Sequence, residues 1–455
     1  MDTRNCYKDK KIMVVGLGKS GIAAADAMLE LGADVTIQDA KSEADTPKEL
    51  VEGFRNRGAE LYLGSMPEDM SRFDMLILSP GVNPEADFVV KAMEAGAEIT
   101  GELETAFRLA KGSFVAITGT NGKTTTTTLV GEIFKNSGRI TYVVGNIGVA
   151  VVSKALESKE DDWMITETSS FQLQTVRDFN PIVSAILNIT PDHLNRHHTM
   201  ENYAKAKANI FINQQEDGYC IINADDSLCT ELARECKAKV IPFSSTKELE
   251  QGAFLMKDEL VLRCEDGSLI HLCRKDELKI IGKHNIENAL AAAAICYYAG
   301  IAPEDIRDTL RSFGGVEHRI ELCGEKNGVK FYNDSKGTNV DAALTALRAI
   351  EKNIVLIAGG DGKSQDFKPF VDNFNGSVKH MVLIGRDGPV IAKACDEAGF
   401  SAYSYGKDME ECVAKAVSVA EPGDTVLLSP ACASWDMYKN FEQRGDHFKD
   451  IVSKL

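Results

Sequence analysis

The chain has 455 residues, of which 44% are hydrophobic and 26% are charged, the proportions of an ordinary water-soluble protein. This length predicts about three domains, each able to bury its own core. Because 51 Lys and Arg residues stand against 68 Asp and Glu residues, the formal net charge is −17. Such a charge argues against nucleic acid or an anionic membrane as a partner. Anionic ligands must then be held by local groups, such as loop amides, single basic side chains and metal ions.

The eleven cysteines are scattered and form no CxxC pair, which predicts reduced thiols and no disulfide or zinc framework. The N-terminal segment MDTRNCYKDKKIMVVG lacks the apolar region of a signal peptide. The longest apolar run, Ala289–Ala299, is far shorter than the ~20 residues of a membrane span. We therefore expect a cytoplasmic, monomeric enzyme with no membrane partner.

From the N-terminus onward, short apolar runs alternate with helical stretches, which predicts a doubly wound α/β unit. Its strands are expected at Lys11–Val15, Asp34–Gln38, Asp74–Leu78 and Glu98–Thr100. The glycine turn Gly16–Gly21, GLGKSG, follows the first strand, and Asp39 follows the second. Such a turn at a helix N-terminus holds a diphosphate, and the acidic residue suits a ribose hydroxyl. The first unit is thus predicted to bind a phosphorylated ligand.

A second unit is expected to begin with a helix near Glu102–Lys111 and to continue with strands at Phe114–Thr118, Thr141–Val144, Trp163–Glu167 and Val183–Asn188. Its first strand leads into a glycine- and threonine-rich loop made of Gly119, Thr120, Asn121, Gly122, Lys123, Thr124 and Thr125. The loop is an abbreviated P-loop, because Ile117 stands where the full pattern has glycine. Lys123 is expected at the terminal phosphates of a nucleotide, and the Thr124 hydroxyl at Mg²⁺.

Two further strand ends point to metal chemistry. Glu167 ends one strand and His193 follows another, in NITPDH, so both side chains are expected at the edge of the sheet beside the phosphate loop. A carboxylate, a threonine hydroxyl and phosphate oxygens form a natural Mg²⁺ shell. The helical segment Tyr203–Phe211 carries Lys205 and Lys207, which face different sides because they are two residues apart. The residues alone do not choose between these lysines.

The C-terminal half continues the same alternation. Glu259–Cys273 is predicted to be an antiparallel hairpin with a turn at Asp266-Gly267, and Ile286–Ala299 a strong helix. After Gly314-Gly315 a third parallel unit is expected, with strands at Asn353–Ala358, Met381–Ile384 and Thr425–Leu428. We predict an α/β fold with three domains: a Rossmann-like domain at 1–101, a P-loop ATPase-like domain at 102–315 and a second Rossmann-like domain at 316–455. The hinges are expected near Gly101 and Gly314-Gly315.

Taken together, the segments resemble those of the Mur ligases, the ATP-dependent peptide-bond-forming enzymes of peptidoglycan precursor synthesis. The resemblance covers essentially the whole chain, in the order GTNGKTT, ETSSFQ, NITPDH, the helix with Lys207, GKHNIENALAA, HRIE, NDSKGTN, GGDGKS and SPACASWDMYKNFEQRG. The last four segments are similar to those of the branch that adds D-glutamate to UDP-N-acetylmuramoyl-L-alanine. Alanine-adding relatives typically have a histidine-containing segment in place of NDSKGTN, and folylpolyglutamate synthases lack the UDP-binding first domain.

The resemblance implies roles for individual residues. The UDP substrate would be bound by Gly18, Lys19, Ser20, Asp39, Ser79, Gly81 and Asn146. ATP would be bound by the loop Gly119–Thr125 together with Asn285, Asn288, Arg319 and Asp334. The D-glutamate pocket would contain Lys336, Thr338, Lys363, Ser434 and Phe441. Two positions depart from the family, since Lys41 stands where an arginine can contact uridine and Trp435 where a smaller apolar residue can occur.

The resemblance also implies the chemistry. The substrate carboxylate would be activated by ATP as an acyl phosphate, which the amine of D-glutamate then attacks. Lys123, Glu167, His193 and Lys207 would form the catalytic group. Lys207 would be carbamylated and, with Thr124, Glu167 and His193, would hold Mg²⁺, as two ions. Two alternatives remain from the glycine turn alone: a NAD-dependent oxidoreductase, and a non-catalytic UDP-sugar sensor.

Overall fold

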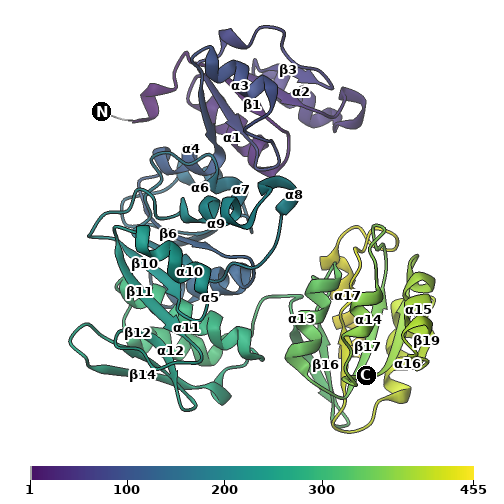
Figure 1. Cartoon of the computed structure of the whole chain (residues 1–455). Helices are drawn as coiled ribbons and strands as arrows, with labels where there is room; N and C mark the ends of the chain where they lie inside the picture. Colours follow the sequence, from purple (N-terminus) through teal and green to yellow (C-terminus); the bar gives the residue numbers. More distant parts are fainter. Residues whose placement is uncertain (1–2) are drawn as a thin grey trace. The chain divides into compact units, whose positions relative to one another are not determined.

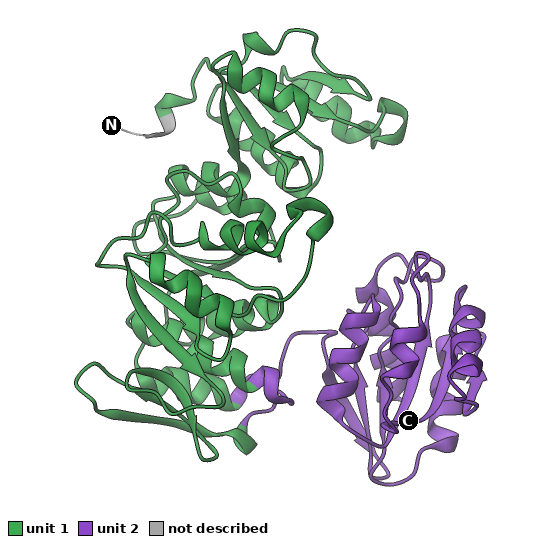
Figure 2. Cartoon of the chain, in the orientation of Figure 1, with its two compact units in different colours: residues 1–277, 286–311 green, residues 278–285, 312–455 purple. Residues whose placement is uncertain are grey.

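Within residues 3–455, which the computed structural model describes, three mainly parallel β-sheets organise the chain (Figure 1). The chain divides by contact into two compact units (Figure 2). The first comprises Met1–Glu277 with Ile286–Arg311, and the second comprises Leu278–Asn285 with Ser312–Leu455. The first unit contains two of the sheets and the second unit contains one. The α/β fold with three sheets is confirmed, whereas the domain boundaries at 101 and 315 stay predictions.

The first sheet has five parallel strands in the order β3-β2-β1-β4-β5. They are β1 Lys11–Val15, β2 Asp34–Asp39, β3 Glu60–Leu63, β4 Met75–Leu78 and β5 Glu98–Gly101. Helices α1 Lys19–Glu30 and α2 Lys48–Asn56 cover one face, and α3 Asp87–Glu94 covers the other. Four of these strands were predicted. The strand β3 was not predicted, because it is a four-residue edge strand that is only partly buried.

The second sheet has nine strands in the order β14-β13-β12-β11-β10-β9-β6-β8-β7. They are β6 Ser113–Thr118, β7 Thr141–Gly145, β8 Trp163–Glu167, β9 Val183–Ile186, β10 Tyr219–Asn223, β11 Lys239–Ser244, β12 Gly252–Met256, β13 Glu259–Arg263 and β14 Leu269–Arg274. The seven strands β6 to β12 pair in parallel. The strands β13 and β14 add an antiparallel edge that includes the predicted hairpin. The strand β9 ends at Ile186, two residues earlier than expected.

Nine α-helices accompany this sheet within the described part of the chain: α4 Glu102–Leu109, α5 Lys123–Asn136, α6 Val152–Ala155, α7 Ser170–Leu173, α8 Leu194–His197, α9 Met200–Ala208, α10 Ser227–Leu232, α11 Lys283–Tyr298 and α12 Pro303–Ser312. Helix α9 stops at Ala208, so the expected helix through Phe211 was too long at its end. Helices α1, α4 and α6 pack together, and one hydrophobic cluster runs from the first sheet into the second. This shared core explains why both sheets lie in one unit.

The third sheet, in the second unit, has the order β15-β16-β20-β17-β18-β19. Its strands are β15 Glu321–Lys326, β16 Val329–Asn333, β17 Ile354–Gly359, β18 Val378–Ile384, β19 Tyr403–Tyr405 and β20 Thr425–Leu428. Along β17, alternate residues face opposite sides, so α13 Val340–Ile350, α14 Lys368–Asp372 and α15 Gly388–Glu397 cover one face. The other face is covered by α16 Met409–Val419 and α17 Phe441–Ser453. The unit is doubly wound, as predicted.

Short 3₁₀ turns complete the described chain, at Thr3–Cys6, Glu43–Asp45, Met70–Arg72, Ala233–Glu235 and Lys275–Glu277. A search of the helices among the described residues finds none with the length and apolar character needed to cross a bilayer.

A buried acid lies where the first sheet joins the second. Glu102, at the start of α4, is 2% exposed, and one of its carboxylate oxygens accepts the Val152 N–H at 2.6 Å. The other oxygen is buried and has no hydrogen-bond partner among the described residues. Burial raises the pKa of Glu102 to about 7, because the charged form loses its water shell.

Glu102 should therefore make stability depend on pH. The pKa of Glu102 is higher in the folded protein than in the unfolded chain. Its contribution to folding stability is therefore fully present below about pH 4.5 and is lost as the pH rises through about 7. We expect Glu102→Gln, measured by thermal unfolding, to gain midpoint temperature relative to the parent protein between pH 5 and pH 8. The exposed control Glu49→Gln should show no such trend. If the difference in midpoint temperature between Glu102→Gln and the parent stays the same from pH 5 to pH 8, the raised pKa of Glu102 is wrong.

Candidate functional site

Most of the predicted site residues follow the carboxyl ends of parallel strands in all three sheets, whereas Lys207, Asn285 and Asn288 lie on helices. In the first sheet these are the turns after β1, β2 and β4, and in the second the segments after β6, β7, β8 and β9. In the third sheet they are the turns after β16, β17 and β20. Ligands of α/β sheets bind at this edge, where backbone amides and helix N-termini converge.

The glycine turn of the first sheet is built by close backbone packing. A side chain at Gly21 would meet the Gly16 carbonyl oxygen at 1.7 Å, so α1 can approach β1 only with glycine there. The carboxylate of Asp39 accepts the Leu17 N–H at 2.6 Å and the Lys41 N–H at 2.8 Å. Asp39 thus holds the turn in shape. Gly18, Lys19 and Ser20 begin α1, with Gly18 and Lys19 exposed to solvent.

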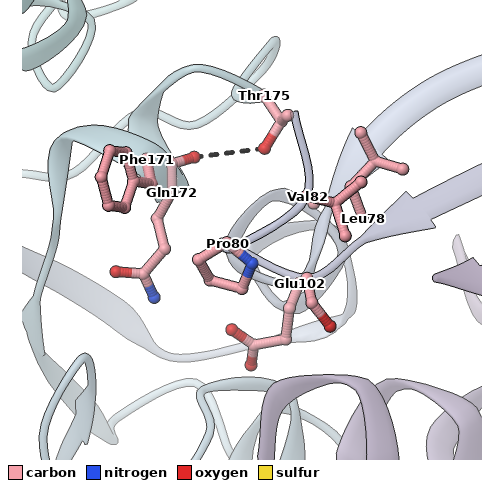
Figure 3. Close-up of a pocket in the computed structure, with 9 residues that line it drawn as sticks. Leu78, Pro80, Val82, Glu102, Phe171, Gln172 and Thr175 are labelled. Atoms are coloured by element: carbon pink, nitrogen blue, oxygen red, sulfur yellow. Dashed lines mark hydrogen bonds between the residues drawn. The ribbon is translucent and has the colours of Figure 1, made fainter. Parts of the chain in front are cut away.

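A second turn, Ser79–Val82, follows β4 and is called here the substrate turn. The Ser79 hydroxyl donates to the Gly16 carbonyl oxygen at 3.3 Å, which ties this turn to the glycine turn. Figure 3 shows the small cavity beside it, where Phe171 and Gln172 of α7 lie opposite Pro80 and Val82. The structure therefore brings the predicted residues Gly18, Ser79 and Gly81 into one region.

The phosphate loop after β6 turns at a glycine that no other residue could replace without a clash. Gly122 has φ +83°, and a side chain there would meet the Asn288 amide oxygen at 2.3 Å. The same oxygen accepts the Thr126 hydroxyl at 3.2 Å. Asn288, on α11, thus packs directly against the start of α5. The loop is further held by Asn188, whose amide oxygen accepts the Asn121 N–H at 2.8 Å.

Two lysines converge on this loop. The Lys123 ammonium donates to the carbonyl oxygens of Gly119 and Thr120, each at 2.8 Å, and the Lys207 ammonium donates to the same Gly119 oxygen at 2.8 Å. Burial lowers the pKa of Lys123. Burial, reinforced by the charge of Lys123, lowers the pKa of Lys207 to about 7. Lys207 is therefore a lysine with a substantial neutral fraction near pH 7.

Glu167 provides a carboxylate beside these lysines. It is 1% exposed, and its Oε1 accepts the Asn146 amide at 2.8 Å. Its Oε2 is buried without a hydrogen-bond partner among the described residues. Glu167 and Asp192 both attract Lys123 and Lys207 electrostatically. An unpaired buried carboxylate oxygen is costly unless something cationic or protic binds it.

His193 lies at the same edge, in the left-handed conformation (φ +52°) immediately before α8. Its ring is 4.8 Å from the ring of Phe171, and it is about half exposed. The ring is therefore free to bind a ligand from the solvent side. It is flanked by Asp192, whose carboxylate lies 3.4 Å from Nε2.

The two lysines of α9 differ in their exposure to solvent. Lys205 is 64% exposed and pairs with Glu201 at 2.7 Å, whereas Lys207 is 1% exposed. The Lys207 ammonium lies 4.6 Å above the ring of Tyr203, and the Tyr203 hydroxyl is 3.1 Å from that of Thr120. Tyr203 was missed as a site residue, although it lies at the start of the helical segment that carries both lysines.

In the second unit, Asp334 is fully buried at the end of β16. It accepts the Ser429 hydroxyl at 2.8 Å, and Arg319 Nη1 lies 3.7 Å from its Oδ1. Burial raises the pKa of Asp334 to about 6. Asn285 is also in this unit, where its amide donates to the Ile281 carbonyl oxygen at 2.7 Å. Of the predicted adenine and ribose residues, Asn285, Arg319 and Asp334 therefore lie in the second unit and Asn288 in the first.

The five residues predicted for D-glutamate come from three neighbouring turns and from α17. Lys336 and Thr338 follow β16, and the Lys336 ammonium lies 5.8 Å from the ring of Phe441. Lys363, after β17, is exposed and lies 4.3 Å above the ring of Trp435. Ser434, after β20, is 2% exposed. These side chains surround one end of the third sheet.

Arg444, on α17, donates to two of these turns and was not predicted as a site residue. It is 2% exposed, and it donates to the Ser335 hydroxyl (2.9 Å), the Ser335 carbonyl oxygen (2.8 Å) and the Cys432 carbonyl oxygen (3.1 Å). The Ser335 hydroxyl in turn donates to the Phe441 carbonyl oxygen at 2.8 Å. Burial lowers the pKa of Arg444 to about 10. Its place in the FEQRG segment was the available signal.

Three family models match successive parts of the chain. They are the Mur ligase MurD-like N-terminal domain at residues 10–101, the Mur ligase middle domain at 117–296 and the glutamate ligase domain of Mur ligases at 318–432. Each match contains one of the three sheets or most of it. The order of the matches follows the order of the sheets.

Similar proteins extend over nearly the whole length. The chain is 46% identical over 453 residues to UDP-N-acetylmuramoylalanine--D-glutamate ligase of Alkaliphilus metalliredigens, covering 98% of the chain and 99% of the relative. It is 48% identical over 451 residues to the enzyme of that name from Alkaliphilus oremlandii, with the same coverage. Among solved structures, UDP-N-acetylmuramate-alanine ligase MurC of Thermotoga maritima matches with a TM-score of 0.59 at 21% identity, covering 98% of this chain and 99% of that one. Neither an oxidoreductase nor a sensor is supported by these relatives.

Proposed function

The chain belongs to the Mur ligase family, and on that premise we propose that it is an ATP-dependent ligase of peptidoglycan synthesis. It adds D-glutamate to UDP-N-acetylmuramoyl-L-alanine through an acyl phosphate and forms ADP and phosphate. The observation that carries this function is the near full-length identity of 46–48% to ligases of that name. We place the reaction in the cytoplasm.

The phosphate loop supports the first step. The substrate carboxylate is a poor electrophile, so one of its oxygens attacks the γ-phosphorus of ATP and ADP leaves. Lys123 is held 2.8 Å from two loop carbonyl oxygens, where it can turn to the terminal phosphates and stabilise their developing charge. The neutral amine of D-glutamate then attacks the acyl carbon, a peptide bond forms, phosphate leaves with the electrons of the acyl–oxygen bond, and one amine proton is released.

A divalent cation fits the residues beside the loop. The buried Oε2 of Glu167, which has no hydrogen-bond partner among the described residues, is the oxygen that would bind Mg²⁺. Thr124 and His193 lie at the same edge of the sheet. Glu167, Thr124, His193 and carbamylated Lys207 would hold two ions, which supply charge neutralisation to the phosphates when bound. Asn146 would orient Glu167 through its 2.8 Å hydrogen bond.

Carbamylation of Lys207 is supported by its surroundings. Formation requires a neutral amine, and burial together with Lys123 lowers the pKa of Lys207 to about 7. The amine nitrogen attacks CO₂, an N–C bond forms and one proton is released to water. The carbamate nitrogen keeps one N–H, so the 2.8 Å bond to the Gly119 oxygen can persist. The carbamate replaces a cation with an oxygen ligand, which a divalent ion prefers.

The substrates are assigned to separate turns. The UDP substrate is bound by Gly18, Lys19, Ser20, Asp39, Ser79, Gly81 and Asn146. ATP is bound by the loop Gly119–Thr125 with Asn285, Asn288, Arg319 and Asp334. D-glutamate is bound by Lys336, Thr338, Lys363, Ser434 and Phe441, where two lysines suit two carboxylates.

A substrate panel tests this function. Release of ADP and phosphate from ATP should require both UDP-N-acetylmuramoyl-L-alanine and D-glutamate. L-glutamate should fail, because a pocket that holds two carboxylates and an amine discriminates the configuration of the carbon between them. Equal turnover with L-glutamate, or with UDP-N-acetylmuramate and L-alanine, would overturn the proposal.

A further inference from the structure

Arg196 connects two segments that are far apart in sequence. Its guanidinium donates from Nη2 to the Val82 carbonyl oxygen at 2.6 Å and from Nη1 to the Gly81 carbonyl oxygen at 3.3 Å. Both acceptors belong to the substrate turn after β4. Nη2 also donates to the Gln174 side-chain oxygen at 3.2 Å. Arg196 itself is in α8, so it joins the first sheet to the edge of the second.

The ring of Phe171 lies between this guanidinium and His193. Its carbon lies 5.2 Å from the ring centre of Phe171, and that ring lies 4.8 Å from His193. Phe171 also stacks on His197 at 5.5 Å, and His197 Nε2 is 3.0 Å from the Ser170 hydroxyl. Phe171 is therefore held between Arg196 and two histidines.

The substrate turn is packed tightly against α7. The cavity between them, lined by residues that include Ser79, Pro80, Val82, Phe171 and Gln172 (Figure 3), has a volume of only about 10 Å³, room for about one water molecule. A small displacement of the turn would therefore meet α7 or open a gap. The two bonds from Arg196 hold the Gly81–Val82 end of this turn.

No carboxylate within residues 3–455 forms an ion pair with Arg196, and its Nε is buried without a hydrogen-bond partner there. Burial lowers the pKa of Arg196, and the charge of Glu85 partly offsets this effect. A planar guanidinium can meet two adjacent carbonyl oxygens at once, which an ammonium cannot do equally well. The contacts therefore use the geometry of arginine as well as its charge.

We propose that Arg196 is a positioning residue for the UDP substrate, which holds the substrate turn Ser79–Val82 in its binding shape against α7. This inference rests on the proposed function, in which Ser79 and Gly81 contact the substrate. Binding of the UDP substrate then depends on a residue of α8, three positions after His193. ATP binding at the loop Gly119–Thr125 does not depend on it, because Arg196 makes none of its hydrogen bonds to that loop.

Calorimetry with UDP-N-acetylmuramoyl-L-alanine, without ATP or metal, tests the proposal directly. Arg196→Met keeps the apolar stem but removes the donors, and should raise the Kd about tenfold or more, since two charge-assisted bonds are lost. Arg196→Lys keeps the positive charge but loses the planar guanidinium, so its Kd should lie between those of the parent and of Arg196→Met. In steady-state assays the KM for the UDP substrate should rise while the KM for ATP stays within about twofold.

The matched control is Arg177→Met, because Arg177 is 69% exposed and pairs only loosely with Glu98, at 3.6 Å. It should bind the UDP substrate as the parent does. Thermal unfolding separates positioning from a loss of folding. The proposal is overturned if Arg196→Met binds the UDP substrate with the parental Kd. It is also overturned if Arg196→Lys binds as weakly as Arg196→Met and both variants lose ATP affinity to the same extent. Failure of the proposed function would differ, because the parent protein would then lack turnover in the substrate panel.

Discussion

Replacing Lys207 by alanine should remove most of the ligase activity, and added formate or acetate should restore part of it. The physical reason is that Lys207 acts as a carbamate in the proposed site, so the variant lacks an anionic oxygen ligand and not a cation. A short carboxylate that enters the vacated space, beside Glu167 and the phosphate loop, replaces that oxygen. The measurement is phosphate release at saturating substrates, with and without each carboxylate.

The neighbouring lysine is the control for this experiment. Lys205→Ala should keep parental activity, because Lys205 is 64% exposed and forms a surface pair with Glu201, a kind of pair that contributes little. Chloride at the same ionic strength should not restore Lys207→Ala. If carboxylates restore nothing and the parent protein carries no CO₂ adduct on Lys207, that side chain works as an ammonium and the carbamate proposal is wrong.

Replacing Lys363 by alanine should raise the KM for D-glutamate by roughly 10- to 150-fold. This corresponds to about 1.5–3 kcal/mol for one charge-assisted contact to a carboxylate. Lys363 is exposed, with its ammonium 4.3 Å above the Trp435 ring, so its loss should leave the fold of the third sheet intact. The KM values for ATP and for the UDP substrate should change little.

Lys393→Ala provides a matched change in the same unit, since Lys393 is 78% exposed on α15 and lies 3.8 Å from Glu397. It should leave all three KM values at the parental level. A fall in ATP affinity for Lys363→Ala, with an unchanged D-glutamate KM, would instead assign Lys363 to the nucleotide. Thermal unfolding of both variants checks that neither result comes from a loss of structure.

The sequence by itself determined the parts of the molecule that depend on local pattern. Buried parallel strands are continuous apolar runs, and this signal located most strands of the three sheets. The glycine turn at Gly16 and the phosphate loop at Gly119 were recognisable because their backbones require glycine at set spacings. The order of motifs along the chain also identified the family, which the relatives confirm. The roles of single site residues stay predictions.

Several strands escaped the same reasoning, among them β10, β16 and two that are short or partly polar. The edge strand β3 is only partly buried, and β15 has just one apolar aliphatic residue among polar ones. In such segments pairing with a neighbour, and not hydrophobicity, makes the strand. The ends of β9 and α9 were also misplaced by two or three residues, since the apolar residues Leu187, Ile210 and Phe211 continue the local pattern while the backbone already turns.

Only the tertiary structure decided which polar side chains are buried. Lys205 and Lys207 are equivalent in sequence, yet one faces water and the other is packed against Tyr203 and the Gly119 carbonyl. Arg196 and Arg444 carry no sequence signal for the carbonyl oxygens that they bind, because those acceptors come from turns more than ten residues away. Burial and backbone acceptors arise when distant segments pack together, so no local pattern encodes them.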